Sequence, residues 1–366
     1  MTGRGQFWFW LGGVAAFAGA LYVFRSILFP FVAGMAVAYL LDPVVDKLEK
    51  WGLGRAAGTA IALVAFFVAA AAALLLLAPV LQSQILDFAG RAPELFAALR
   101  ARLGGFVEML EARLSPEDIE RLRTAAASFA GDALALIGRL IESLWSGGLA
   151  LFNLLSLIFI TPIVAFYLLR DWDRIVGAVD GWLPLRHAEA IRALAREADE
   201  LLSGFLRGVA MVCLILGAFY GIALSLIGLE FGLFIGLAAG LLSFVPFIGA
   251  FFGFVISVGV ALAQFTESEW FRIALVAGVF VLGQVVEGNF LTPRLVGKRV
   301  GLHPVWVIFA LLAGGVLFGF VGLLLAVPLA VVIGVLVRFG LGRYLESPFH
   351  RGSVPPGADP DRSEPP

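Results

Sequence analysis

The sequence lacks most of the residue patterns that enzymes use. It contains one cysteine, Cys213, which lies in an apolar run, so no disulfide can form within the chain and a packed apolar thiol is the simplest interpretation. The three histidines, His187, His303 and His350, lie far apart, and neither a paired metal motif nor a nucleophile elbow is present. The absence of a Walker A motif excludes ATP as the chain's own energy source. We therefore expect no enzyme activity, no metal and no cofactor.

Charged residues are scarce as well. They make up 14% of the sequence, and 26 Lys and Arg nearly balance 27 Asp and Glu. This balance gives neither a basic surface for nucleic acid nor an acidic solvating tail. Hydrophobic residues make up 61% of the chain and its mean hydropathy is +0.97, well above the values of a soluble globular domain. The composition predicts an integral membrane protein whose main partner is the lipid bilayer.

The N-terminus raises the question of a cleaved signal peptide. Arg4 precedes an apolar run at residues 7–24 that contains small residues suited to a cleavage site. This run has about the length of a full span, no soluble domain follows it, and Arg25 leads directly into more apolar sequence. We therefore expect a retained signal-anchor helix.

Continuous apolar runs of roughly 20 residues are long enough to cross a bilayer and predict transmembrane helices. They lack the alternation of barrel strands, and helices satisfy their own backbone groups in lipid. The predicted spans are residues 7–24, 56–81, 148–169, 208–227 and 271–291. A shorter run at 27–41, interrupted by Pro30 and Gly34, predicts a tilted or shallow helix. The expected fold class is an all-α, polytopic helical bundle.

Two longer apolar stretches, residues 231–265 and 304–339, predict hairpins because each is interrupted near its middle. The first break, at 244–249, leaves arms of about 15 residues, or roughly 22 Å of helix, which is short for a span. The second break and its returning arm contain Gly314, Gly315, Gly319, Gly322 and Pro328. Either hairpin could be two short spans or a re-entrant loop. Interrupted segments of this kind indicate a transporter's site, since their freed backbone groups can face a solute.

Two segments are polar enough to leave the membrane. Charges alternate with Leu, Phe and Ala at helical spacing in both, which predicts amphipathic helices, one of them starting at Ser115. The resulting organisation is N-terminal transmembrane helices at 1–86, an extracytoplasmic amphipathic segment at 87–147, a C-terminal transport region at 148–343 with a cytoplasmic amphipathic helix at 171–207, and a disordered tail at 344–366.

The positions of Lys and Arg predict the orientation in the membrane. These residues gather in loops at 47–55, 170–207 and 294–299 and at the C-terminal end, and all four groups agree with both termini in the cytoplasm. The break at 244–249 would then face inward and the break at 314–322 outward. The two hairpins would be opposed, although the sequence shows no convincing internal repeat.

Glu287 stands out among the polar residues because it interrupts an apolar span beside Gln284 and Asn289. An acid within a span is costly unless it faces a cavity or a partner. Two interpretations stay open: coupling to protons or cations during transport, or a salt bridge with Arg294 or Arg299 at the cytoplasmic end of the helix. Aromatic residues crowd the first break; they either pack a membrane core or line a path for a small amphiphilic solute.

Residues 287–304 read Glu-Gly-Asn-Phe-Leu-Thr-Pro-Arg-Leu-Val-Gly-Lys-Arg-Val-Gly-Leu-His-Pro and precede an apolar run rich in glycine. Further motifs are Phe-Tyr-Leu-Leu-Arg-Asp at 166–171, Leu-Arg-Gly at 206–208 and Phe-Val-Pro-Phe-Ile-Gly at 244–249. In this order and spacing, the set resembles the autoinducer-2 exporter family of permeases. The resemblance spans nearly the whole chain.

The resemblance implies a multi-pass protein of the bacterial inner membrane that forms a homo-oligomer and exports a small signalling molecule, with sodium–proton exchange proposed for some members. The family motifs place Pro246 and Gly249 at the first break. The candidate transport-path residues are Phe244, Pro246, Phe247, Gly249, Glu287, Asn289, Pro293, Gly297, Pro304, Gly315 and Gly319. Two positions depart from the family pattern, Val209, where Gln is frequent, and Ala250, where Pro is common.

Three functions remain open at this point. The first is a secondary permease that exports a small organic, autoinducer-2-like molecule. The second is a sodium or other cation/proton antiporter that works through Glu287. The third is a non-transporting membrane scaffold, in which the outer helices between residues 87 and 146 dock partners.

Overall fold

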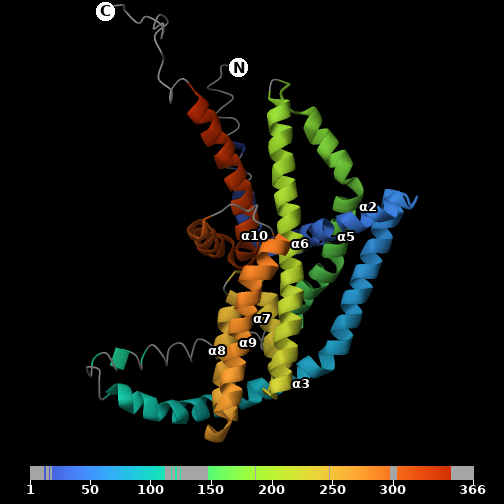
Figure 1. The fold of residues 1–366 in the computed structure, drawn as a ribbon. Helices are drawn as coiled ribbons and strands as arrows, with labels where there is room; N and C mark the ends of the chain where they lie inside the picture. The colour runs from blue at the N-terminus through green and yellow to red at the C-terminus, as the bar shows by residue number, and fades with distance from the viewer. Residues whose placement is uncertain are drawn as a thin grey trace, which may run out of the picture. The chain divides into compact units, whose positions relative to one another are not determined.

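The computed structural model describes residues 12, 13, 16, 19–111, 117, 120, 121, 124, 147–185, 187–246, 248–296 and 303–347. These residues form helices and short turns and include no strand, which confirms the all-α class (Figure 1). In chain order the elements are η1 (Arg25–Ile27), α2 (Leu28–Lys50), α3 (Arg55–Glu111), α5 (Gly147–Gly181), α6 (Ala188–Ile227), α7 (Gly232–Leu242), α8 (Ile248–Gln264), η2 (Glu267–Glu269), α9 (Trp270–Val286), η3 (Glu287–Val296) and α10 (Pro304–Glu346).

Within these ranges, five helices are long and apolar enough to cross a membrane. They are Leu28–Lys50, Arg55–Phe88, Ala188–Ile227, Trp270–Val296 and Pro304–Glu346. The run at 27–41 therefore belongs to a full-length helix, because Pro30 lies in the first turn of α2, where a missing N–H is tolerated. The expected helix at 7–24 lies largely outside the described residues, as does the helix start at Ser115.

Two polar segments that we expected as separate helices are continuous with spans. α3 runs from its apolar half into its charged half across residues 86 and 87, and α6 does the same near residue 207. A change of polarity alone does not end a helix; a helix ends where a breaker or a cap is placed. The domain boundaries drawn from the sequence stay predictions.

The chain divides into two compact units, and α5 and α6 contribute to both. Unit 1 comprises Met1–Asp173 and Gly204–Gly297, and unit 2 comprises Arg174–Ser203 and Lys298–Pro366.

Arg55 joins three helices in unit 1. Its Nε donates a hydrogen bond to the carbonyl of Leu169 in α5 at 3.0 Å, and its guanidinium lies 3.0 Å from Asp173. Three acids of α2 lie within 3.9 Å of the same guanidinium; they are Asp42, Asp46 and Glu49. Beside this network, a core cluster unites α2, α3 and α5 through small and aliphatic side chains such as Ala38, Ala62 and Ala165. From the sequence we expected Arg55 only to indicate the cytoplasmic side of the membrane. In the structure its side chain connects α3 to α2 and α5.

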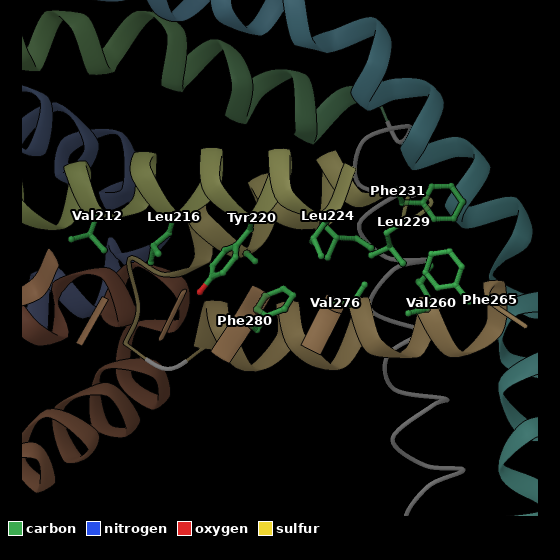
Figure 2. Close-up of a cluster of buried hydrophobic side chains, with 13 residues drawn as sticks. Val212, Leu216, Tyr220, Leu224, Leu229, Phe231, Val260, Phe265, Val276 and Phe280 are labelled. Carbon is green, nitrogen blue, oxygen red and sulfur yellow. The ribbon is translucent and has the colours of Figure 1, made fainter. Parts of the chain in front are cut away.

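The second cluster of unit 1 unites α6, α7, α8 and α9. Its buried side chains include Tyr220 and Leu224 of α6, and Val276 and Phe280 of α9, which face one another in Figure 2. α6 and α7 approach so closely that a Cβ added at Gly236 or Gly240 would overlap the backbone of Gly221 or Gly217. Contacts of this kind hold helices together in lipid, where the hydrophobic effect does not drive association.

The first predicted hairpin is confirmed as α7 and α8. α7 has 11 residues and α8 has 17, or about 16 and 25 Å of helix. Gly249, at the start of α8, lies against the carbonyl of Ala239 and the hydroxyl of Ser243, so a side chain at this position would push the two arms apart. Ser243 is itself buried and donates its hydroxyl to the carbonyl of Ala239 at 2.9 Å.

The second predicted hairpin lies in unit 2, where α10 bends sharply at Gly319. The φ of +61° and ψ of −134° at this residue are accessible to glycine and strained for other residues. Gly314 and Gly322 touch across the bend, although eight residues of straight helix would separate them by about 12 Å. The break falls within the predicted segment, and Pro328 is buried in the second arm.

Ion pairs organise the rest of unit 2. Arg192 donates two hydrogen bonds to Asp180, at 2.6 and 2.8 Å, and so closes the turn between α5 and α6. This hydrogen-bonded guanidinium holds the pKa of Asp180 below its ordinary value. Arg338 of α10 lies 3.3 Å from Glu197 of α6.

Replacing Gly236 by alanine tests the close contact between α6 and α7. Because the added Cβ would overlap the backbone of Gly221, we expect Gly236→Ala to destabilise the protein by about 1–3 kcal/mol. The measurement is the midpoint of thermal unfolding in detergent. Gly278→Ala is the matched control, since that position in α9 has open space around it and alanine favours helix by up to about 1 kcal/mol. Equal midpoints for the two variants would contradict the contact.

Candidate functional site

Glu287 lies on the face of α9 that packs against α6. The buried residues of α9 are Val276, Phe280 and Gly283, and Glu287 follows Gly283 by four residues, so it shares their face. At Glu287 the backbone changes from α-helix to the π-helical segment η3, which runs for 10 residues. π-helical turns occur frequently at functional sites.

Tyr220 of α6 faces this part of α9. Its side chain is fully buried, and its ring stacks on Phe280 with centroids 4.6 Å apart and an interplanar angle of 22° (Figure 2). The ring and its hydroxyl lie directly against Gly283, where any larger residue would displace them. The hydroxyl lies near the side-chain amide of Gln284, but among the described residues no hydrogen bond of normal geometry reaches it. A buried hydroxyl without a partner is costly, so its position calls for a polar species.

The carboxylate of Glu287 lies at the same interface. It accepts a hydrogen bond from Nε2 of Gln284 at 2.7 Å, and it lies within electrostatic reach of both Tyr220 and Cys213 of α6. Arg294 instead places its guanidinium over the ring of Phe290, 5.5 Å from the centroid. The geometry therefore favours an inward-facing acid over a salt bridge to Arg294, and Arg299 lies outside the described residues.

These side chains form a small polar site in apolar surroundings, which we call the Glu287 site: Tyr220, Gln284 and Glu287. It offers a carboxylate, an amide and a phenol hydroxyl, which can bind a proton, a hard monovalent cation or the hydroxyl groups of a small solute. In the part of the chain that the structure describes, no three His, Cys, Asp or Glu side chains gather as a metal site.

Two motifs far apart in the sequence meet beside this site. Gly208, the last residue of the Leu-Arg-Gly motif, lies against the backbone of Leu295 and Val296 in η3, so closely that a Cβ there would overlap Leu295. Val209, next along α6, is buried. The motif at 206–208 therefore holds η3, and the acid at its start, against α6.

The structure connects the first break to the Glu287 site through α8. Gly253, one turn after Gly249, packs against the Phe280 ring, which in turn stacks on Tyr220. Phe254 also contacts Phe280 edge-on, with centroids 6.1 Å apart.

The other predicted path residues are distributed more widely. Phe244 and Pro246 are half-buried in the turn between α7 and α8, and Pro293 is half-buried in η3. Asn289 donates to the carbonyl of Val285 at 2.9 Å, which is a bond within its own helix. Phe247 and Gly297 lie outside the described residues, and Pro304, Gly315 and Gly319 belong to unit 2.

The sequence did not predict Tyr220 as a site residue, because it is one aromatic residue within an apolar run. The signal was present: a tyrosine in the middle of the apolar run 208–227 carries a hydroxyl that needs a partner.

A separate pocket of about 310 Å³ lies in unit 2. Its lining is mostly apolar, with basic groups from His187 and Arg343, and includes Ala190, Ile191, Leu194 and Phe339. None of the predicted path residues contributes to it.

Apolar spans, two broken hairpins and an acid at a helix interface are features of a multi-pass α-helical membrane transport protein. The sequence profile of the AI-2E family transporter matches residues 11–342, and the chain belongs to this family. YrrI of Bacillus subtilis (strain 168), a proposed transport protein, is 31% identical over 86% of this chain and 87% of its own length. PerM of Escherichia coli (strain K12), a proposed permease, is 28% identical over 89% of this chain and 90% of its own. The family resemblance and the membrane-transport class are thereby confirmed.

Tyr220→Phe tests whether the buried hydroxyl serves transport. The substitution keeps the stacked ring and removes only the oxygen, so we expect an unchanged or slightly higher unfolding temperature, since an unpartnered buried hydroxyl is lost. Transport should fall about tenfold, as for the loss of one hydrogen bond to the transported species. Tyr220→Leu is the control that also removes stacking. Unchanged transport by Tyr220→Phe in reconstituted vesicles would contradict a role of the hydroxyl.

Proposed function

We propose that this protein is a secondary permease that exports a small organic signalling molecule, similar to autoinducer-2, across the bacterial inner membrane. The observation that carries the proposal is the position of the Glu287 site, where a half-buried acid lies at the same helix interface as the buried hydroxyl of Tyr220. The site is connected through α8 to the first broken hairpin. A path that runs from the turn at residues 243–246 to Glu287 would pass few polar groups before it reaches the carboxylate, amide and hydroxyl of the Glu287 site, which suits a small uncharged solute that forms hydrogen bonds at that site.

The remaining features of the proposal follow from the sequence. Both termini lie in the cytoplasm, the charged half of α3 lies outside, and the protein assembles as a homo-oligomer. The path residues are those predicted at the two breaks and in the segment 287–304.

Flux through purified protein in liposomes tests the export proposal. We expect a furanone-like solute loaded on one side to cross faster than in empty liposomes, because its hydroxyl groups can form hydrogen bonds with the carboxylate, amide and hydroxyl of the Glu287 site. Gly278→Ala protein, altered at an uncrowded position, should match the wild type. Absence of flux above empty liposomes for every furanone tried would count against this substrate class.

A second candidate function is cation/proton antiport through Glu287. It is favoured by one observation, the approach of a single carboxylate to the amide of Gln284 and to Tyr220, an arrangement that can exchange a proton for a monovalent cation. Glu287→Gln keeps the shape and removes the charge, and should abolish proton movement driven by a sodium gradient, read with a pH-sensitive dye. Glu94→Gln, at an exposed position of α3, is the matched control. Intact exchange in Glu287→Gln would dismiss this function.

A further inference from the structure

At the outer end of the hairpin, α7 begins and α8 ends. The backbone N–H and carbonyl groups there have no hydrogen-bond partners within their own helices. Phe231, which precedes α7, has a left-handed φ of +60° and offers no side-chain cap to the first N–H groups of the helix. The last carbonyls of α8 likewise lack N–H donors within that helix. In the low-dielectric surroundings of a membrane protein, such groups need partners from elsewhere.

α3 supplies the partner for the start of α7. The side-chain oxygen of Gln84 accepts a hydrogen bond from the backbone N–H of Phe234 at 3.0 Å. Phe234 is the third residue of α7, and its N–H is one of those that an N-cap side chain normally satisfies. Gln84 therefore acts as a cap, 150 residues away along the chain.

The same helix supplies a partner for the end of α8. Arg102 donates to the carbonyl of Leu262 at 2.7 Å and also to the carbonyl of Phe265. A guanidinium at this place satisfies late carbonyls and complements the negative end of the helix dipole.

A third contact lies between these two. Arg91 of α3 forms an ion pair of 2.8 Å with Glu230 in the turn between α6 and α7. Glu230 is tied in turn to α8, since its N–H donates to Gln264 at 2.8 Å and Gln264 donates to the carbonyl of Gly228 at 2.8 Å. All the outer ends are thereby joined to one another and to α3.

These three polar residues share one face of α3 with apolar residues that bury against the hairpin. Ala92 is only 2% exposed, Phe88 meets Phe231 edge-on at 5.3 Å, and Leu95 packs on the core cluster. The face consists of residues 84, 88, 91, 92, 95, 99 and 102, which recur at helical spacing. We name it the clasp.

We infer that the clasp fixes the outer ends of α7 and α8 during transport, so that the turn at residues 243–246 is the end of the hairpin that moves. Gln84, Arg91 and Arg102 are then positioning residues for the transport path, and the charged half of α3 has a role within the protein itself. The inference rests on the proposed function only where transport is measured. The measurement of hydrogen exchange depends only on the ion pair and the hydrogen bonds of the clasp.

Charge exchange between Arg91 and Glu230 tests the clasp. Arg91→Glu and Glu230→Arg should each lower transport about two- to fivefold, because like charges replace an ion pair. The double variant should recover most of the wild-type rate. Hydrogen exchange of α7 amides should rise in both single variants and return in the double variant. Arg100→Gln, at an exposed position of the same helix, is the matched control and should change neither readout.

The two readouts separate the possible failures. If the wild type carries no solute or ion, the proposed function fails, while hydrogen exchange still reports on the clasp. Unchanged exchange in the single variants, or no recovery in the double variant, overturns the clasp. Changed exchange with unchanged transport overturns the positioning role and leaves a contact that only stabilises the fold.

A covalent tether tests whether the clasp stays closed. Cys213 is the sole cysteine, so Cys213→Ala gives a background in which Arg91→Cys and Glu230→Cys can be joined by a short bifunctional maleimide. We expect transport by the tethered protein to equal that of the same variant before tethering. Loss of transport with the 91–230 tether overturns the inference.

Discussion

The contact on which unit 1 depends is the crossing of α6 and α7 at backbone distance. Lipid offers no hydrophobic driving force between helices, so association relies on close van der Waals contact, which glycine permits. Gly240 contacts Gly217 and Gly236 contacts Gly221 in this way. These two contacts fix how the hairpin of α7 and α8 packs on α6. The position of α9 follows, because its Phe280 fills the space between α8 and Tyr220.

The sequence was sufficient to predict the fold class and both hairpin breaks. Apolar run length and Gly or Pro interruptions are local properties, and they place a turn before Gly249 and a bend at Gly319 correctly. Glu287 was also found, since an acid in an apolar run is conspicuous. What it faces was not predictable: its position relative to Tyr220 is set by the packing of α9 on α6, which no local pattern encodes. For the same reason, the contacts of Arg55 with α2 and α5 could not be predicted from the sequence.

Gly208 contacts η3 and so brings together two segments that are far apart in the sequence, the motif at 206–208 and the segment 287–296. A π-helical segment is less stable than an α-helix and needs support from its neighbours. Here the support is a backbone contact that excludes any side chain at Gly208. Val209, the next residue of α6, is buried beside this contact.

The caps supplied by Gln84 and Arg102 join parts of the chain that are 150 and 160 residues apart. During synthesis α3 leaves the ribosome long before α7 and α8, and N-terminal segments fold first. The hairpin is therefore completed against a helix that has already been synthesised. Its formation has a fixed order in consequence: a chain that stops before residue 234 contains Gln84 and Arg102 but not the helix ends that they cap.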